Sequence, residues 1–283
     1  MPCLTWTTEV YHVRPAVAKR ITIQLVGAKN DQGDVRLGDF VDQLSVIKKA
    51  LFERERLVSR TEQPQIDYKI VGLRRESPAT IVLEPIALNG TRGYAEKVVA
   101  GFSRELRLIG REAKIVDEPD VHRLEAYRRI GHRSDNLIAK VKIAVGKSPV
   151  TIDHVFKENV DKILGPDELV EGTISGMLEA VNFHNANKFT LYPPIGARKI
   201  NGTFDPTLRP KIKEAIGNFV TVLGKLRYKQ WSPFPHGMIA EDVDIHEPDA
   251  SLPSLSELRG AFAGITGDRN SVEFVDTLRD ESW

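Results

Sequence analysis

Polar and apolar residues alternate with a period of two in five short segments between Glu171 and His246. This alternation predicts strands that bury one face and expose the other. Between the third and fourth segments the apolar spacing changes to that of a helix, which we expect over residues 208–216. The five expected strands span residues 173–181, 188–192, 198–204, 219–228 and 238–245.

Three strands, a helix and two strands form the element order of the five-stranded OB barrel. Gly176 lies inside the first expected strand and Gly224 inside the fourth. A small barrel needs sharp bends in its longer strands, and glycine permits them. Residues 167–247 are therefore expected to form a small, closed, OB-like β-barrel, a shape that is used mostly for binding.

Residues 1–166 carry a different pattern, in which helical and strand periods mix. Helices with one apolar face beside short strands predict an α+β domain, an α/β sandwich-like region with its helices on one face of a sheet. This region can be interpreted as one domain or as two sub-parts, 1–112 and 113–166. Strands are expected over 20–27, 65–73, 79–86 and 138–145, and helices over 37–59, 93–110, 120–130 and 153–164.

Stretches rich in glycine and proline divide the chain. Gly165-Pro166 ends the last helix of the first region, because proline cannot continue it, and marks the boundary with the barrel. After the barrel, residues 247–254 contain two prolines and are interpreted as a linker. Beyond it, two short helices are expected over 255–261 and 271–279, so that residues 248–283 form a linker and a helical docking tail.

The chain has 283 residues, of which 41% are hydrophobic, and a formal net charge of +1. This composition is typical of a protein that buries a core, and the net charge gives no general sign of a nucleic-acid partner. A single cysteine, Cys3, excludes a disulfide within the chain, as expected in a reducing compartment. No apolar run reaches the roughly 18 residues that span a bilayer, and the N-terminus lacks a signal-peptide pattern. We therefore expect a cytoplasmic protein without a membrane partner.

Catalytic motifs give no candidate. Gly146-Lys147-Ser148 resembles the end of a phosphate-binding loop, but Val141 stands where that loop needs a glycine. The seven histidines are scattered and no cysteine pair accompanies them, which argues against a zinc site. No catalytic residue, cofactor site or metal site is predicted, and a carboxylate pair among the 39 acidic residues stays the alternative. The sequence thus favours a binding protein over an enzyme.

In OB barrels the ligand lies across the second and third strands and the neighbouring loops. Here these segments carry aromatic rings that could stack on bases and cations that could contact phosphates, the combination that single-strand binding uses. The alternative is a barrel that packs only on a partner protein or on its own N-terminal domain, with some of these rings in its core. The candidate nucleic-acid-binding residues are Lys188, Phe189, Tyr192, Arg198, Lys199 and Trp231.

A second group of cations comes from the helix expected over 120–130 and the residues after it. Adjacent helical residues point about 100° apart, so Arg128 and Arg129 do not share a face. Arg129 and Arg133 would share one if the helix continued through Gly131. A solvated helix face explains the group, and a functional surface is the alternative. Its members are Arg123, Arg128, Arg129 and Arg133.

The C-terminal segment 271–283 predicts a short amphipathic helix. Ser271 is expected to cap its start, and a helix this short needs a surface on which to dock. That surface belongs either to the chain itself or to a partner that receives the helix in a groove. The candidate partner-binding residues are Val272, Phe274, Val275, Leu278, Arg279 and Trp283.

The run Val-Glu-Phe-Val-Asp-Thr-Leu-Arg-Asp-Glu, followed by a terminal Trp, resembles the tail that many bacterial antitoxins insert into PIN-domain ribonuclease toxins. In those families a tail arginine reaches the acidic metal site of the toxin, and Arg279 matches it. The resemblance implies an antitoxin-like neutraliser of such a ribonuclease. It is confined to the tail, because the ribbon-helix-helix or AbrB-like domain of small antitoxins has no counterpart at this N-terminus, which leaves operator binding without support.

The barrel region resembles uncharacterised bacterial proteins that contain an OB barrel, and that resemblance implies no activity. The sequence therefore leaves two functions open. The first is a non-enzymatic regulatory protein that holds a ribonuclease partner through its C-terminal helix. The second is a module that binds single-stranded nucleic acid on the face of the barrel.

Overall fold

The computed structural model describes residues 20–27, 32–88, 90–91, 93–131, 138–146, 148–184, 187–196, 198–247, 255–258 and 264–281. The chain divides into two compact units, Met1–Pro166 and Asp167–Trp283. Within the described ranges the fold is a mixed α+β arrangement with two five-stranded sheets, one in each unit. None of the described helices is long and apolar enough to cross a membrane.

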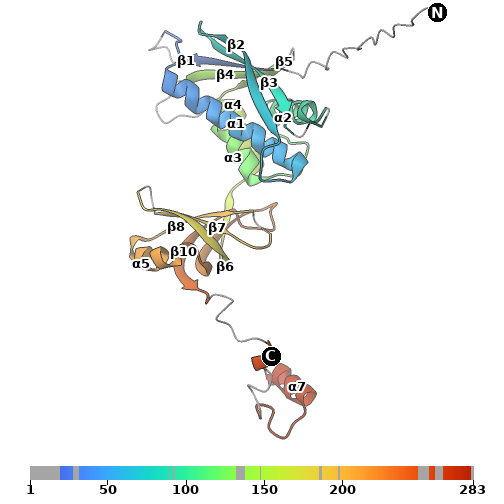
Figure 1. The fold of residues 1–283 in the computed structure, drawn as a ribbon, viewed down its shortest axis with the longest axis vertical. Helices are drawn as coiled ribbons and strands as arrows, with labels where there is room; N and C mark the ends of the chain where they lie inside the picture. The colour runs from blue at the N-terminus through green and yellow to red at the C-terminus, as the bar shows by residue number, and fades with distance from the viewer. Residues whose placement is uncertain are drawn as a thin grey trace, which may run out of the picture. The chain divides into compact units, whose positions relative to one another are not determined.

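The first unit is built on an antiparallel sheet with the strand order β2-β3-β1-β4-β5 (Figure 1). Side chains of β1 alternate strictly between buried and half-buried, so that Ile21, Ile23 and Leu25 lie in the core. This is the period of two that the sequence predicted for residues 20–27. The strands are β1 (Ile21–Gly27), β2 (Ile66–Arg74), β3 (Ala79–Ala87), β4 (Ile138–Val145) and β5 (Ser148–Ile152).

Helices cover one face of this sheet, as the sequence predicted (Figure 1). Asp120 and Asp153 cap the third and fourth helices, because each carboxylate accepts a backbone N–H bond three residues later. The apolar stripes of the helices face the sheet, and Phe102 and Leu106 are fully buried there. The helices are α1 (Leu37–Ser59), α2 (Tyr94–Glu112), α3 (Val121–Arg129) and α4 (His154–Leu164).

The proposed division of the first unit into 1–112 and 113–166 is wrong. Strand β1 lies between β3 and β4 and pairs with both, so that one sheet spans the proposed boundary. Helix α3 likewise packs against α1. Backbone pairing between segments more than a hundred residues apart leaves no local signal in the sequence.

The second unit contains a five-stranded sheet that closes on itself, because β10 pairs with both β8 and β9. Among the described strands, β8 and β10 form the parallel pair and the other pairs are antiparallel. A short helical segment, η2 (Pro206–Leu208) followed by α5 (Arg209–Ala215), connects β8 to β9. The strands are β6 (Asp167–Asn182), β7 (Lys188–Tyr192), β8 (Ile200–Phe204), β9 (Phe219–Lys229) and β10 (Gly237–Ile245).

Two glycines allow neighbouring strands of the barrel to approach closely. A Cβ atom at Gly176 would lie 2.6 Å from the carbonyl oxygen of Tyr192, and one at Gly224 would lie 2.0 Å from that of Ile239. No other residue fits at either position without moving backbone. Strand β6 begins at Asp167, earlier than the sequence predicted, because its first residues pair with the end of β9.

The C-terminal part of the second unit contains α6 (Leu255–Leu258) and α7 (Ser271–Glu281). The sequence predicted a helix over 255–261, and residues 259–261 of that prediction lie outside the described residues, as do residues 248–254 of the predicted linker. Helix α7 covers the predicted segment 271–279 and extends it by two residues.

Candidate partner-binding surfaces

Helix α7 begins with a side-chain cap at Asn270. Its Oδ1 atom accepts hydrogen bonds from the backbone N–H groups of Val272 and Glu273, both at 3.0 Å, and its carbonyl oxygen accepts one from Phe274. The sequence predicted Ser271 in this role, which is wrong by one residue. Asparagine and serine are both good caps, so the pattern could not choose between neighbours.

The apolar residues of α7 form an exposed ridge. Val272, Val275 and Leu278 are 70%, 45% and 50% exposed, and they follow one another at intervals of three. Arg279 is exposed, and it follows Val272 by seven residues and Val275 by four, which places it on the same face. We call Val272, Val275, Leu278 and Arg279 the tail ridge.

Phe274 lies beside the tail ridge and is half-buried, with the guanidinium of Arg269 5.5 Å from its ring centre. The intramolecular cover reduces the ring area that a partner could contact. Trp283, the last of the predicted partner-binding residues, lies outside the described residues. The structure therefore brings four of the six predicted residues together on one exposed face.

Phe189 does not belong to a binding surface. Its side chain is 2% exposed and packs in the barrel core, with its ring centre 6.2 Å from that of Phe204. The neighbours Lys188 and Tyr192 point outward and are exposed, as the alternation of β7 requires. The prediction of base stacking by Phe189 is therefore wrong, because alternation identifies two faces without telling which one is inside.

Exposed aromatic and apolar side chains gather instead in the loops at one end of the barrel. Tyr192 is 38% exposed, Ile195 85% and Phe234 47%. The loop before β8 touches the loop before β10, since a Cβ atom at Gly196 would lie 2.4 Å from the ring of Phe234. We call Tyr192, Ile195, Phe234, Arg198 and Lys199 the barrel rim.

The remaining predicted residues of the barrel sit near these loops. Arg198 and Lys199 are half-buried in the segment that leads into β8, and Trp231 is half-buried in the turn that follows β9. Ile195 and Phe234 were missed by the sequence analysis. Phe234 stands between two prolines, which favour a loop over a strand, and this signal could have identified it as a loop residue.

A small polar cluster fixes the start of β6 to the barrel. The carboxylate of Asp167 lies 2.6 Å from the ammonium of Lys229 and 3.3 Å from Nε2 of His236. Burial opposes ionisation of Asp167, but the hydrogen bond from Lys229 and the charge of His236 outweigh it and lower the pKa of this carboxyl group. The cluster ties β6 to β9 and to the loop before β10.

The cation group predicted around α3 is dispersed in the structure. Arg123 is 1% exposed, and its Nε atom forms an ion pair with Glu105 at 3.2 Å, while its Nη2 donates to the carbonyl oxygen of Glu118 at 2.6 Å. Arg128 pairs with Glu125 and Asp161 on the surface, and Arg129 is exposed. Arg133 lies outside the described residues. Arg123 therefore has a structural role.

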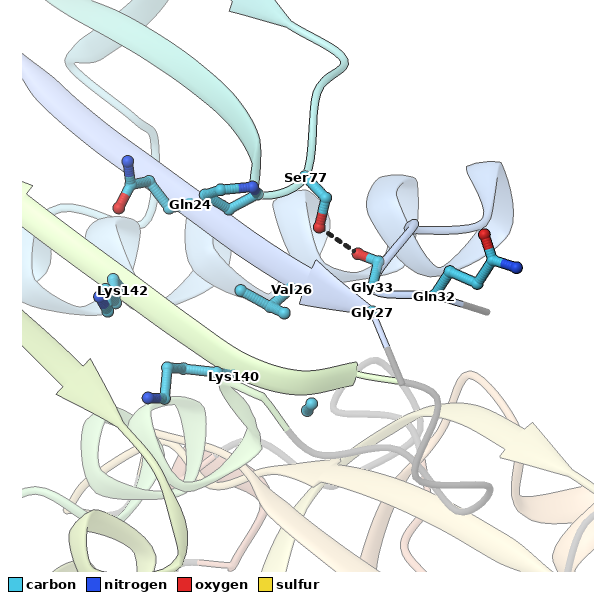
Figure 2. A pocket seen from close by; sticks show the side chains of 10 residues that line it. Gln24, Val26, Gly27, Gln32, Gly33, Ser77, Lys140 and Lys142 are labelled. Carbon is cyan, nitrogen blue, oxygen red and sulfur yellow. Dashed lines mark hydrogen bonds between the residues drawn. The ribbon is translucent and has the colours of Figure 1, made fainter. Parts of the chain in front are cut away.

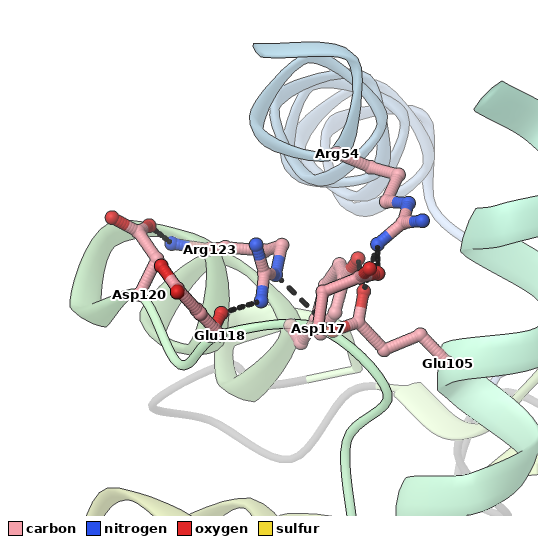
Figure 3. A network of polar contacts seen from close by, with 7 residues as sticks. Arg54, Glu105, Asp117, Glu118, Asp120 and Arg123 are labelled. Atoms are coloured by element: carbon pink, nitrogen blue, oxygen red, sulfur yellow. Dashed lines mark hydrogen bonds and ion pairs between the residues drawn. The ribbon is translucent and has the colours of Figure 1, made fainter. Parts of the chain in front are cut away.

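Figure 3 shows the buried network to which Arg123 belongs. Arg54 reaches from α1 to Glu105 on α2, at 3.3 Å, and to Asp117 in the following loop. The hydroxyl of Tyr127 donates a hydrogen bond, 2.8 Å long, to the carboxylate of Glu105. Burial, followed by the charge of Glu105, raises the pKa of Tyr127 well above its ordinary value. The network links α1, α2 and α3 through one carboxylate.

No group of three or more metal-binding side chains lies together in the part of the chain that the structure describes. Comparisons with protein-family models, with curated proteins and with solved structures gave no match. The surfaces must therefore be interpreted from their own chemistry.

Proposed function

We propose that this chain is a non-enzymatic binding protein of the cytoplasm that holds a protein partner through the tail ridge. The observation that carries this proposal is the exposure of three apolar side chains in line on a capped helix. Leaving such side chains in water costs free energy that a partner's groove would recover. A short amphipathic helix with anchors at this spacing is a common ligand of hydrophobic grooves.

The partner that fits the tail ridge best is a PIN-type ribonuclease. Arg279 stands within the ridge, so a groove that received Val275 and Leu278 would bring its guanidinium to the partner's surface. Acidic residues that hold a catalytic metal would attract this group strongly, because guanidinium and carboxylate form bidentate hydrogen bonds. The resemblance of the tail to antitoxins of such ribonucleases supports the same assignment. Inhibition would follow from occupation of the metal site.

Co-expression with the product of the adjacent gene tests this proposal. The full chain should co-purify with that product, whereas a chain that ends at Asp249 should not. A second variant, Arg279→Ala, should keep most of the binding and lose most of the inhibition of ribonuclease activity. Equal recovery of the partner by the full and the shortened chain would contradict the proposal.

A second candidate function, the binding of single-stranded nucleic acid, is favoured by the barrel rim. We propose that the barrel is of the OB type, which is supported by its closed strand order, its parallel β8–β10 pair and the helix between β8 and β9. Exposed rings at Tyr192 and Phe234 beside Arg198 and Lys199 supply the stacking and the charge that single-strand binding needs.

Oligonucleotide binding tests the second candidate. Stacking on one aromatic ring contributes about 1–3 kcal/mol per base, so Tyr192→Ala and Phe234→Ala should each weaken binding of a single strand by about fivefold or more. The logarithm of the binding constant should fall with the logarithm of salt concentration by about 0.7 per phosphate contact. Leu223→Ala, an exposed apolar residue of β9 outside the rim, is the matched control. Binding that does not depend on salt or on either ring would exclude the rim.

A further inference from the structure

The sheet of the first unit has a second face, opposite its four helices. Residues that stand directly opposite each other in paired antiparallel strands share a face. One row across the sheet is Arg74, Thr80, Gln24, Lys142 and Thr151, on β2, β3, β1, β4 and β5 in turn. Each is exposed or half-buried, whereas residues that alternate with them on β1, β3 and β4, such as Ile23, Ile81 and Val141, are buried. We call this side of the sheet the open face.

Cations gather on the open face. Lys140 lies two residues before Lys142 on β4, and Lys69 stands beside Glu84 at the other end of the sheet. Arg74, Lys140 and Lys142 make no ion pair within the described part of the chain. The open face also carries two carboxylates, Asp67 and Glu84, and Glu84 is paired with Arg20 at 3.2 Å. The positive charge is therefore concentrated toward Arg74, Lys140 and Lys142.

A hollow of about 720 Å³ lies on the open face beside the two lysines. Figure 2 shows Lys140 and Lys142 on β4 next to Gln24 and Val26 on β1. One wall is closed by a hydrogen bond, 2.8 Å long, from the hydroxyl of Ser77 to the carbonyl oxygen of Gly33. The described residues that line the hollow include no carboxylate. Its chemistry therefore suits an anionic ligand.

The spacing of these cations suits two parallel lines of negative charge. Lys142 and Arg74 are three strands apart in the same row, which is about 14 Å at the usual spacing between strands. Between them lie Gln24 and Thr80, whose amide and hydroxyl groups can donate to phosphate oxygens. The two phosphate backbones that border a groove of double-stranded DNA are separated by a comparable distance, about 12 Å across the major groove.

The described strands present no aromatic side chain on the open face that would stack on bases. Strands β1, β3, β4 and β5 contain no aromatic residue. Tyr68 of β2 stands opposite Pro85 on the helix side and packs beside Ile66. Single-strand binding depends on aromatic stacking, whereas duplex binding can rest on phosphate contacts alone. We propose that the open face binds the phosphate backbones of a nucleic-acid duplex without base-specific contacts.

Binding of a short labelled duplex to the full chain, followed by fluorescence anisotropy, tests this proposal. With three to five phosphate contacts, the log–log salt slope should lie between about −2.7 and −4.5. The variant Arg74→Gln/Lys140→Gln/Lys142→Gln should reduce the slope by about 2.7 units, since each lost contact removes about 0.9. The same measurement with a DNA duplex and an RNA duplex of one sequence shows which of the two binds. The expected salt slope and its reduction in the open-face variant, with either duplex, support the proposal.

The control variant Lys48→Gln/Lys49→Gln/Arg104→Gln removes the same charge from exposed positions on α1 and α2. It should keep the parent slope, and an equal loss in both variants would mean that net charge alone drives binding and would overturn the proposal. Loss of duplex binding in Tyr192→Ala/Phe234→Ala, with none in the open-face variant, would overturn it in favour of the barrel rim.

The extent of acetylation of individual lysines, measured on the unchanged protein, tests the proposal without any variant. In the presence of the duplex, Lys140 and Lys142 should be protected from acetylation, while Lys48 and Lys49 should react as before. Equal reactivity of Lys140 and Lys142 with and without a bound duplex would overturn the proposal.

Discussion

At the residue scale, Glu105 joins three helices of the first unit through its carboxylate. Its fully buried carboxylate forms ion pairs with Arg54 and Arg123 and accepts a hydrogen bond from the hydroxyl of Tyr127. Removing one partner of a buried ion pair leaves the other charges without compensation, and this usually costs about 3–5 kcal/mol. The cost is larger than the gain from the intact network, because the pair itself must overcome desolvation.

Glu105→Gln should therefore lower the free energy of unfolding of the first unit by about 3–5 kcal/mol. Tyr127→Phe, which removes one hydrogen bond to the same carboxylate, should cost about 1–2 kcal/mol. Urea unfolding followed by far-ultraviolet circular dichroism measures both. Glu112→Gln, at an exposed position of the same helix, should stay within about 0.5 kcal/mol of the parent. A Glu105→Gln protein as stable as this control would show that the network contributes little.

Asp167 gives the barrel a dependence on pH. Its folded-state pKa is lowered, so its contribution to stability is fully present above the unfolded value of about 4 and is lost as the pH falls through the folded value. The difference in melting temperature between the parent and Asp167→Asn should therefore be largest near pH 7 and should disappear in strong acid. The fluorescence of Trp231 follows the thermal unfolding of the barrel once Trp6 and Trp283 are replaced by phenylalanine. A difference that is constant with pH would contradict this assignment.

Single residues also show where the sequence was insufficient. Lys188, Phe189 and Tyr192 were predicted together as binding residues, although the alternation in β7 places Phe189 on one face and Lys188 and Tyr192 on the other. The alternation could not tell which face closes around the core, since both carry large apolar or amphipathic side chains. Burial of Arg123 was likewise hidden, because its partner Glu105 belongs to another helix.

At the scale of elements, strongly periodic segments were predicted well. Helix α1 and strand β7 begin and end where the sequence predicted, and β9 and β10 differ by one residue. A stripe of apolar residues or a strict alternation is a local property, and the structure retains it. Element ends depend on partners instead, which is why the pairing of β6 with the end of β9 moved the start of β6 to Asp167.

The N-terminus of α7 is an element end that is set by a side-chain cap, Asn270. Asn270→Ala should destabilise the first turn of α7 by about 1 kcal/mol, because two backbone N–H groups lose their acceptor. Amide exchange of α7 in the full chain, measured by mass spectrometry, should become about five times faster. Ser271→Ala, at the position that the sequence predicted as the cap, should change exchange little. The reverse ranking would place the cap at Ser271.

At the scale of the whole molecule, the mixed α+β class followed from the order of elements, whereas the strand order of the first sheet did not. Pairing of β4 with β1 joins segments that are separated by three helices and a hairpin, and the sequence contains no local record of it. The candidate surfaces likewise differ in whether a local pattern in the sequence reveals them. The tail ridge is a local pattern and was predicted, whereas the barrel rim and the open face depend on which segments lie side by side.

Independent folding of fragments tests this organisation. Residues 167–247 have their own buried core and a sheet that closes on itself, so this fragment should unfold cooperatively when heated. Residues 113–166, the second of the sub-parts considered for the first unit, should not fold alone, because β4 then lacks its partner β1. A nuclear magnetic resonance spectrum should show dispersed amide signals for the fragment 167–247 and poorly dispersed signals for the fragment 113–166. A folded 113–166 fragment would contradict the single sheet.

Equilibrium binding between this chain and the purified product of the adjacent gene tests the central claim most directly. Val275→Asp/Leu278→Asp should weaken binding by about 30-fold or more, since buried anchors of an interface contribute about 2 kcal/mol or more. Glu273→Gln/Thr277→Ala, on the side of α7 away from the tail ridge, is the control and should bind as the parent does. Binding that is unchanged by the two aspartates would contradict the claim that the tail ridge holds the partner.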